Sequence, residues 1–133
     1  MIAKRVKENS ICSRLVFNRT EISFEAAFRK VSYILREYET YEGLLINIYT
    51  LSAEDMIMEK INAYLKRREI RDLYDIFFLL RYVKDDTKVR LGLKKIIDNF
   101  AEPEDEHELK ALILFGVVPK SYEMIDYIKR WLK

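Results

Sequence analysis

The chain has 133 residues, of which 50% are hydrophobic and 35% are charged, and its net charge at pH 7 is +2. This composition excludes a disordered chain, and so small a net charge excludes a strong global field for nucleic acid. A single cysteine, Cys12, excludes an internal disulfide, and no apolar run reaches the ~20 residues that span a bilayer. We therefore expect one cytoplasmic domain over residues 1–133, with no membrane contact.

The first part of the chain is rich in short runs that are typical of β-strands. RLVFN and TEISFE alternate apolar and polar side chains and meet at a short turn, so we expect them to pair as a hairpin. LLINIYTL is the clearest strand. The stretch between, residues 27–43, fits either period: Phe28, Val31 and Leu35 lie at helical spacing, whereas Val31, Tyr33 and Leu35 alternate as in a strand. We leave it open, with a preference for an extended segment.

From Ser52 onward the hydrophobic period becomes helical. Ser52 is a good N-cap, and Glu54 and Asp55 follow in the first turn, where negative charge suits the helix dipole. The apolar stripes predict helices over residues 53–66, 71–83, 87–100 and 105–115, the last of these closed by Gly116, and a final helix capped by Ser121. The predicted fold class is α+β: a short β-rich N-terminal layer over residues 1–51, followed by an α-helical bundle of about five helices over residues 52–133.

Charged residues interrupt the apolar helices around residues 58–80. Asp72 and Asp75 are three residues apart and share a helix face, and Arg71 precedes Asp75 by four. Lys60 and Arg67, two turns apart, share a face of the preceding helix. Two antiparallel helices would bring these groups together, either as an ion-pair network that holds the helices or as a phosphate site. Spacing favours the network, and it predicts that Asp75 is largely buried and paired with a basic residue, Arg71 being the nearest.

The stretch LSAEDMIMEKINAYLKRREIRDLYDIFFLL resembles the AbiEii/AbiGii family of nucleotidyltransferase toxins, found in abortive-infection and type IV toxin–antitoxin systems. The family has a Glu-Lys pair, then Ala and Arg, then Arg-Asp-x-Tyr-Asp at the start of a hydrophobic helix. The matching residues are Glu59-Lys60, Ala63, Arg67 and the run from Arg71 to Asp75. The recognisable resemblance covers residues 44–83.

This resemblance implies a polymerase-β-like fold and the transfer of nucleotides from a nucleoside triphosphate to an RNA acceptor, tRNA in some members. It implies that Lys60 contacts the triphosphate, with Arg67 and Arg71 as further nucleotide-binding groups. The implied catalytic acids are Asp72 or Asp75 and, on a weaker match, Glu21 in the run TEIS. An antitoxin protein and RNA are the partners that the resemblance suggests.

The sequence departs from the family pattern in one respect. Nucleotidyl transfer needs a pair of carboxylates that hold metal ions, and the family supplies them as Asp-x-Asp after a glycine-rich turn. Neither motif occurs here, and the first fifty residues contain no Asp. We therefore expect no metal site in this chain, and Mg²⁺ and nucleoside triphosphate as cofactors only if the missing N-terminal half is supplied.

Three explanations of this departure stay open: a C-terminal fragment, one half of a split enzyme, or a degenerate member kept as a binding module. We favour a fragment or a degenerate member that is inactive alone, and the alternative function is a protein–protein interaction module. Strands that lack a partner layer invite another chain. We therefore expect a homodimer or hetero-complex through the N-terminal strands, with Leu15, Phe17, Ile22 and Phe24 in the interface.

Overall fold

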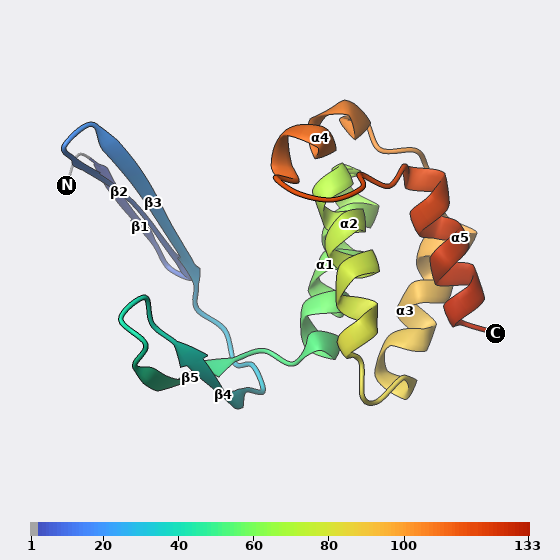
Figure 1. The fold of residues 1–133 in the computed structure, drawn as a ribbon, viewed down its shortest axis with the longest axis horizontal. Coiled ribbons are helices and arrows are strands. Elements are labelled where there is room, and N and C mark those ends of the chain that lie inside the picture. Colours follow the sequence, from blue (N-terminus) through green and yellow to red (C-terminus); the bar gives the residue numbers. More distant parts are fainter. Residues whose placement is uncertain (1–2) are drawn as a thin grey trace. The chain divides into compact units, whose positions relative to one another are not determined.

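The computed structural model describes residues 3–133, with side chains from residue 5 onward, and divides into two compact units, Met1–Ser32 and Tyr33–Lys133. The first unit is an antiparallel sheet in the order β1-β2-β3 (Figure 1). Its strands are β1 (Ala3–Lys7), β2 (Ser10–Phe17) and β3 (Thr20–Ala27). The expected hairpin of the second and third strands is confirmed, whereas the first strand was not predicted.

A two-residue turn closes the hairpin of β2 and β3. Asn18 and Arg19 have φ angles of 46° and 66°, and left-handed residues at both positions match the right-handed twist of the flanking strands. Val16 pairs with Glu21, Leu15 with Ile22 and so on along the ladder. The turn therefore sets which side chains share a face of the sheet.

The sheet has one apolar face and one charged face. Leu15 lies opposite Ile22, and the same face continues through alternate residues of all three strands. On the other face the Arg14 guanidinium pairs with the Glu21 carboxylate at 3.0 Å. The apolar face is exposed, with exposed fractions from 45% to 76%, at Val6, Leu15, Phe17, Ile22 and Phe24.

The second unit begins with a hairpin of β4 (Ile34–Glu39) and β5 (Leu45–Thr50). The stretch that fitted two periods is thus a strand in its second half, as preferred. Gly43 closes the turn with a φ of 79°, a conformation that costs glycine little. The Tyr33 ring contacts the Tyr49 ring edge-on, with centroids 4.8 Å apart.

Two packed helices follow, α1 (Ala53–Arg67) and α2 (Ile70–Leu79), and the second continues as the 3₁₀ turn η1 (Leu80–Tyr82). The Ser52 hydroxyl accepts a hydrogen bond from the Asp55 N–H at 3.1 Å, which confirms the predicted cap. Arg68 ends α1 in the left-handed conformation, with φ 52°, and reverses the chain. The two helices therefore form the expected antiparallel hairpin (Figure 1).

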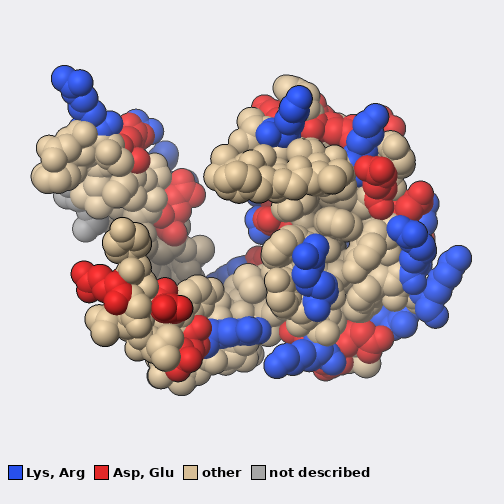
Figure 2. Space-filling view, viewed as in Figure 1, with Lys and Arg blue, Asp and Glu red and all other residues tan. Residues whose placement is uncertain are grey.

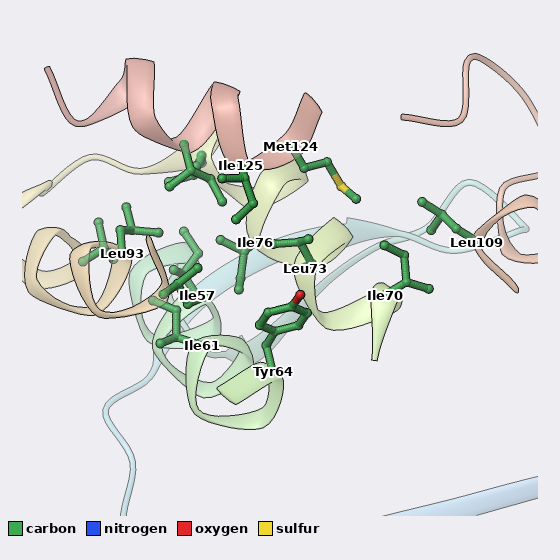
Figure 3. Packing of buried hydrophobic residues seen from close by; sticks show 14 residues of the cluster. Ile57, Ile61, Tyr64, Ile70, Leu73, Ile76, Leu93, Leu109, Met124 and Ile125 are labelled. Carbon is green, nitrogen blue, oxygen red and sulfur yellow. The ribbon is translucent and has the colours of Figure 1, made fainter. Parts of the chain in front are cut away.

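The hydrophobic core lies between these helices, α3 (Thr87–Asp98) and α5 (Ser121–Trp131) (Figure 3). Tyr64 packs in its centre, and its hydroxyl donates to the Ala101 carbonyl at 2.7 Å, so the buried polar group is satisfied. The largest fully buried side chains are Ile57, Ile61, Tyr64, Ile70, Leu73, Ile76, Leu80, Leu93, Ile96, Leu109, Met124 and Ile128.

Two details of the predicted helices were wrong. The fourth is only η2 (Glu106–Glu108) and α4 (Leu109–Leu112), because Leu109 is its one buried residue and most of the apolar run beyond it is exposed, as at Leu114 and Phe115. Gly116 consequently lies in a loop, with φ 101°, and caps no helix. The N-cap of α5 is Lys120, whose N–H donates to the Glu123 carboxylate at 2.8 Å, and not Ser121.

The α+β class is confirmed, with antiparallel strands at the N-terminus and five α-helices within residues 3–133. In that part of the chain, no helix is long and apolar enough to cross a membrane. That residues 1–133 form one domain stays a prediction, since each of the two units is described by itself.

Candidate functional site

Asp72 is the centre of the charged cluster on α1 and α2. Its side chain is 0% exposed, and both of its oxygens have cationic partners. Arg67 donates from Nε to Oδ2 at 2.7 Å and from Nη2 to Oδ1 at 2.9 Å, and the Lys60 ammonium lies 3.4 Å from Oδ1. This two-pronged pairing with a guanidinium is what allows a carboxylate to remain charged away from water.

Asp75 lies at the accessible edge of the same cluster. The Lys60 ammonium is 2.5 Å from its Oδ2, and the side chains of Asp75 and Lys60 are 40% and 33% exposed. The predicted pairing of Asp75 with a basic residue is confirmed, but the prediction that it is largely buried is wrong. The buried carboxylate is Asp72, because the first turn of α2 faces the end of α1.

Arg71 does not pair with Asp75, as its spacing suggested. Its Nε lies 2.6 Å from the Glu69 carboxylate, which also receives Arg67 at 3.3 Å. Glu69 is the N-cap residue of α2, and helical side chains lean toward the helix N-terminus, so Arg71 reaches back to it. Glu69 and Arg71 are two residues apart, so helical spacing does not reveal their pairing.

The charges of the cluster hold one another in their ionised forms. Burial alone would raise the pKa of Asp72, but the hydrogen bonds and charges of Arg67 and Lys60 outweigh it and lower that pKa below its usual value. Burial alone would lower the pKa of Lys60, but Asp75 and then Asp72 raise it. Three cations, Lys60, Arg67 and Arg71, thus meet three carboxylates, those of Glu69, Asp72 and Asp75.

A cleft of about 460 Å³ adjoins the cluster at Arg67 and Arg71. Across it, the Arg68 guanidinium pairs with the Glu104 carboxylate. Asp105 accepts the N–H of Ile70 at 2.7 Å and so satisfies the start of α2 from a point 35 residues away in sequence. Local patterns could not reveal this second set of partners, because α3 separates it from the first.

The donor set of the cluster does not fit a divalent metal ion. Both oxygens of Asp72 are taken by cations, which leaves Asp75 as the accessible carboxylate. Within the described side chains, no group of three or more His, Cys, Asp or Glu residues is placed to hold a metal. The cluster can instead offer hydrogen-bond donors and a positive charge to an anionic group that displaces Asp75.

Glu21, the third predicted acid, lies on β3 in the unit Met1–Ser32. Its carboxylate pairs with Arg14 at 3.0 Å, and both side chains are at least half exposed. The structure thus brings together five of the six predicted site residues, Lys60, Arg67, Arg71, Asp72 and Asp75. A catalytic role for Glu21 stays a prediction.

A family model described as "Nucleotidyl transferase AbiEii toxin, Type IV TA system" matches residues 13–120. The matched range covers most of the chain and extends on both sides of the stretch, residues 44–83, that carried the resemblance. It includes every residue of the cluster on α1 and α2 as well as Glu21. No curated protein and no solved structure gives a significant match.

Proposed function

The chain belongs to the AbiEii family of nucleotidyl transferase toxins of type IV toxin–antitoxin systems, and on this premise we propose that its Lys60–Asp72–Asp75 cluster handles the nucleotide during transfer. One observation carries the proposal. The Lys60 ammonium lies between a fully buried carboxylate and a partly exposed one, so it is held in place yet reachable from solvent. A fixed, accessible cation is what the triphosphate of an incoming nucleotide requires.

The geometry assigns different tasks to the two carboxylates. Asp72 is fully buried and binds Arg67 and Lys60, so it positions these cations. Asp75 is 40% exposed and can meet a substrate, which makes it the better candidate for the essential acid of the motif. Glu21 is the third candidate acid, and Arg67 and Arg71 would add hydrogen-bond donors toward phosphate oxygens.

We propose that a triphosphate binds Lys60 by taking the place of Asp75, whose oxygen is 2.5 Å from the ammonium. In nucleotidyl transfer an acceptor hydroxyl attacks the α-phosphorus, the bond to the bridging oxygen breaks, and pyrophosphate leaves. Lys60 would neutralise charge on the phosphates, and the released Asp75 carboxylate would face the reacting groups. Charge neutralisation and positioning are most of what catalyses phosphoryl-type transfer.

We further propose that this chain does not transfer nucleotides by itself. The reaction depends on metal ions held between the phosphates by paired carboxylates, and the sequence has no Asp-x-Asp motif. The cluster on α1 and α2 does not replace that pair, because Asp72 is saturated by cations. A polypeptide segment carrying the Asp-x-Asp carboxylates and a glycine-rich turn would bind Mg²⁺ and complete the site.

Two measurements test these proposals separately. In the first, the chain is titrated with nucleoside triphosphate by calorimetry. We expect weak, salt-sensitive binding that is lost in Lys60→Ala, strengthened in Asp75→Asn, and unchanged in Lys94→Ala, an exposed lysine of α3. Equal binding by the wild type and Lys60→Ala would refute the nucleotide site.

In the second measurement, the chain is incubated with labelled nucleoside triphosphates, Mg²⁺ and RNA. We expect no labelled RNA. Labelling that disappears in Lys60→Ala would show that the chain is active alone, while leaving the assignment of the nucleotide site intact.

The exposed apolar face of the first sheet supports a second function, that of an interaction module. A sheet of three strands needs a covered apolar face for stability, and Leu15, Phe17, Ile22 and Phe24 are all exposed there. We propose that a second copy of the chain, or an antitoxin as expected in a type IV system, covers this face. Light scattering after size-exclusion chromatography measures the mass of the assembly.

The variant Phe17→Ser/Phe24→Ser should shift this assembly to monomers, because it makes the apolar face polar. Val16→Ser is the matched control, since Val16 lies on the charged face of the same strand and is 38% exposed. A monomeric wild type that binds no antitoxin would remove the support for this second function.

A further inference from the structure

A row of aromatic rings runs along one side of α2 and crosses to α5. The Tyr74 ring contacts those of Phe77 and Phe78, each at 6.2 Å between centroids, and Phe78 contacts Tyr82 at 5.8 Å. Phe77 meets Tyr127 of α5 edge-on at 5.0 Å. The spacing of three and four residues places these rings on one helix face. The fold thus aligns Tyr74, Tyr82 and Tyr127 with the two phenylalanines in one row.

The outer rings of the row are more exposed than packing of the bundle requires. Leu73 and Ile76 are the residues of α2 that fill the core, and both are 0% exposed. Phe78 is 37% exposed and Tyr82 is 48% exposed, so part of each ring is open to solvent. The open rings therefore offer π-surface to a ligand.

The rings of Tyr74, Phe77, Phe78 and Tyr127 border a groove of about 470 Å³ between α2, α5 and the loop before α5. The volume falls within the roughly 300–1,000 Å³ of small-ligand pockets. The residues that line it are Tyr74, Phe77, Phe78, Arg81, Val117, Pro119, Glu123, Tyr127 and Arg130.

Two arginines make the groove cationic as well as aromatic. The Arg81 guanidinium lies 4.4 Å above the centre of the Phe78 ring, and Arg130 lines the groove from α5. Among the described side chains, neither arginine has a carboxylate partner within ion-pair distance. The one acid of the lining, Glu123, accepts the N–H of Lys120 at 2.8 Å and is thereby used in capping α5.

Elsewhere on the bundle, charges of both signs are interspersed, as the face in Figure 2 shows. In this groove, Arg81 is a cation without a carboxylate partner among the described side chains, and it lies beside the partly open ring of Phe78. An apolar partner would leave two guanidinium groups desolvated and unpaired on contact, at a cost in binding. A ligand with flat rings and negative charges satisfies both the rings and the arginines.

We propose that this groove binds a short single-stranded segment of RNA. One base stacks on Phe78 in the groove and a second on Tyr82, whose ring contacts that of Phe78, and the phosphates that connect them pair with Arg81 and Arg130. Single strands are favoured over duplexes, because only unpaired bases present their faces to aromatic side chains. The inference does not depend on the nucleotide site, since none of the groove residues belongs to the Lys60–Asp72–Asp75 cluster.

The test is fluorescence anisotropy of the full chain with a labelled single-stranded RNA of about twelve nucleotides, within the site sizes common for such surfaces. We expect salt-sensitive binding that is weaker for the same RNA as a duplex. Phe78→Leu keeps an apolar side chain but removes the stacking surface, so we expect the affinity to fall about 5- to 100-fold, as for loss of one stacked base. Arg81→Gln should weaken binding and flatten its dependence on salt.

Two exposed residues outside the groove provide matched controls. Tyr41→Ala removes a fully exposed ring in the turn between β4 and β5, and Lys94→Ala removes an exposed cation of α3, so neither should change the RNA affinity. Lys60→Ala should abolish triphosphate binding while RNA binding persists, which separates this inference from the proposed function. The inference would be overturned if the wild type bound no RNA or bound duplex as tightly as the single strand. Unchanged affinity in Phe78→Leu would also overturn it, because it would indicate an apolar partner.

Discussion

Asp72 connects the two helices of the charged hairpin, α1 and α2, through three hydrogen bonds. It receives Arg67 twice and Lys60 once, although its own side chain is fully buried. Removing one partner of a buried ion pair strands the others without compensation, whereas a partly exposed pair is screened by water. Burial, and not the number of charged neighbours, therefore decides how much each carboxylate contributes to stability.

We predict that Asp72→Ala lowers the free energy of unfolding by about 3–5 kcal/mol. Asp75→Ala should cost no more than about 1 kcal/mol, because its pair with Lys60 is partly exposed. Urea denaturation of the two variants and the wild type measures the difference. Equal losses in the two variants would contradict the different burial of the carboxylates.

Glu54 is a second buried carboxylate, in the first turn of α1. It accepts the N–H groups of Lys84 at 2.6 Å and Asp85 at 3.0 Å, so it holds the loop before α3. Burial would raise the pKa of Glu54, but these backbone hydrogen bonds lower it from 4.5 to about 2. The folded state therefore favours the ionised form.

A carboxyl group with a lowered pKa stabilises the fold fully above its ordinary pKa and loses that contribution as the pH falls toward the folded value. We therefore predict that stability declines between pH 4.5 and about 2. Glu54→Gln should flatten this decline, since the amide does not titrate, while it lowers stability at neutral pH by about 1–3 kcal/mol. The measurement is the urea midpoint as a function of pH. The same decline in Glu54→Gln would assign the titration to other groups, Asp72 first among them.

At the scale of elements, Gly92 determines how closely α3 approaches α1. A Cβ at this position would lie 2.8 Å from Cδ1 of Ile61 and 2.9 Å from Sδ of Met58. Ile61 is 1% exposed and has little room to move. The glycine is thus required by the close approach of a neighbouring helix and not by its own backbone, which is helical.

We predict that Gly92→Ala destabilises the chain by about 1–3 kcal/mol, the usual cost of overpacking, although alanine is the better helix former. In an Ile61→Val background, which removes the Cδ1 atom, the cost should be smaller. A double-mutant cycle from thermal melts measures the coupling. Leu91→Ala, at a residue of the same helix that is 79% exposed, should change little. A stabilising Gly92→Ala would show that α1 and α3 separate without strain.

At the scale of the molecule, the fully buried side chains all belong to helices or their immediate ends between residues 57 and 128. The strands of both hairpins instead expose their apolar residues, such as Phe17, Phe24 and Tyr49. The helical bundle therefore has its own core.

We predict that a shortened chain of residues 33–133 keeps the helical signal of the bundle and unfolds within a few degrees of the full chain. Far-UV circular dichroism during heating measures both. Leu73→Ala, at a residue that is 0% exposed, is the reference for a damaged core and should cost about 2–5 kcal/mol. Loss of helicity on shortening would mean that the bundle depends on the first unit.

The sequence by itself determined the hairpin of β2 and β3, the strand β5, the succession of helices after it, the cap of α1 and the family. These features depend on neighbours within about one turn of helix or one hairpin, so period and turn chemistry reveal them. The grouping of charged residues between Glu59 and Asp75 could also be predicted, because they lie on two consecutive helices whose antiparallel pairing follows from a short turn. Local signals conflicted in residues 27–43, and there the prediction was incomplete. After Leu112 an apolar run predicted more helix, but Leu114 and Phe115 are exposed and the prediction was wrong.

Only the tertiary structure decided which charge is buried and which is open. Asp72 and Asp75 look equivalent in sequence, but packing of α2 against α1 buries one and leaves the other 40% exposed. The tertiary structure also decided that Gly92 must be a glycine, because its close neighbours come from another helix. It likewise formed the aromatic groove, whose walls come from α2 and α5. Burial depends on contacts between segments far apart in sequence, and the free energy of a charge or a ring depends on that burial more than on its own neighbours in the chain.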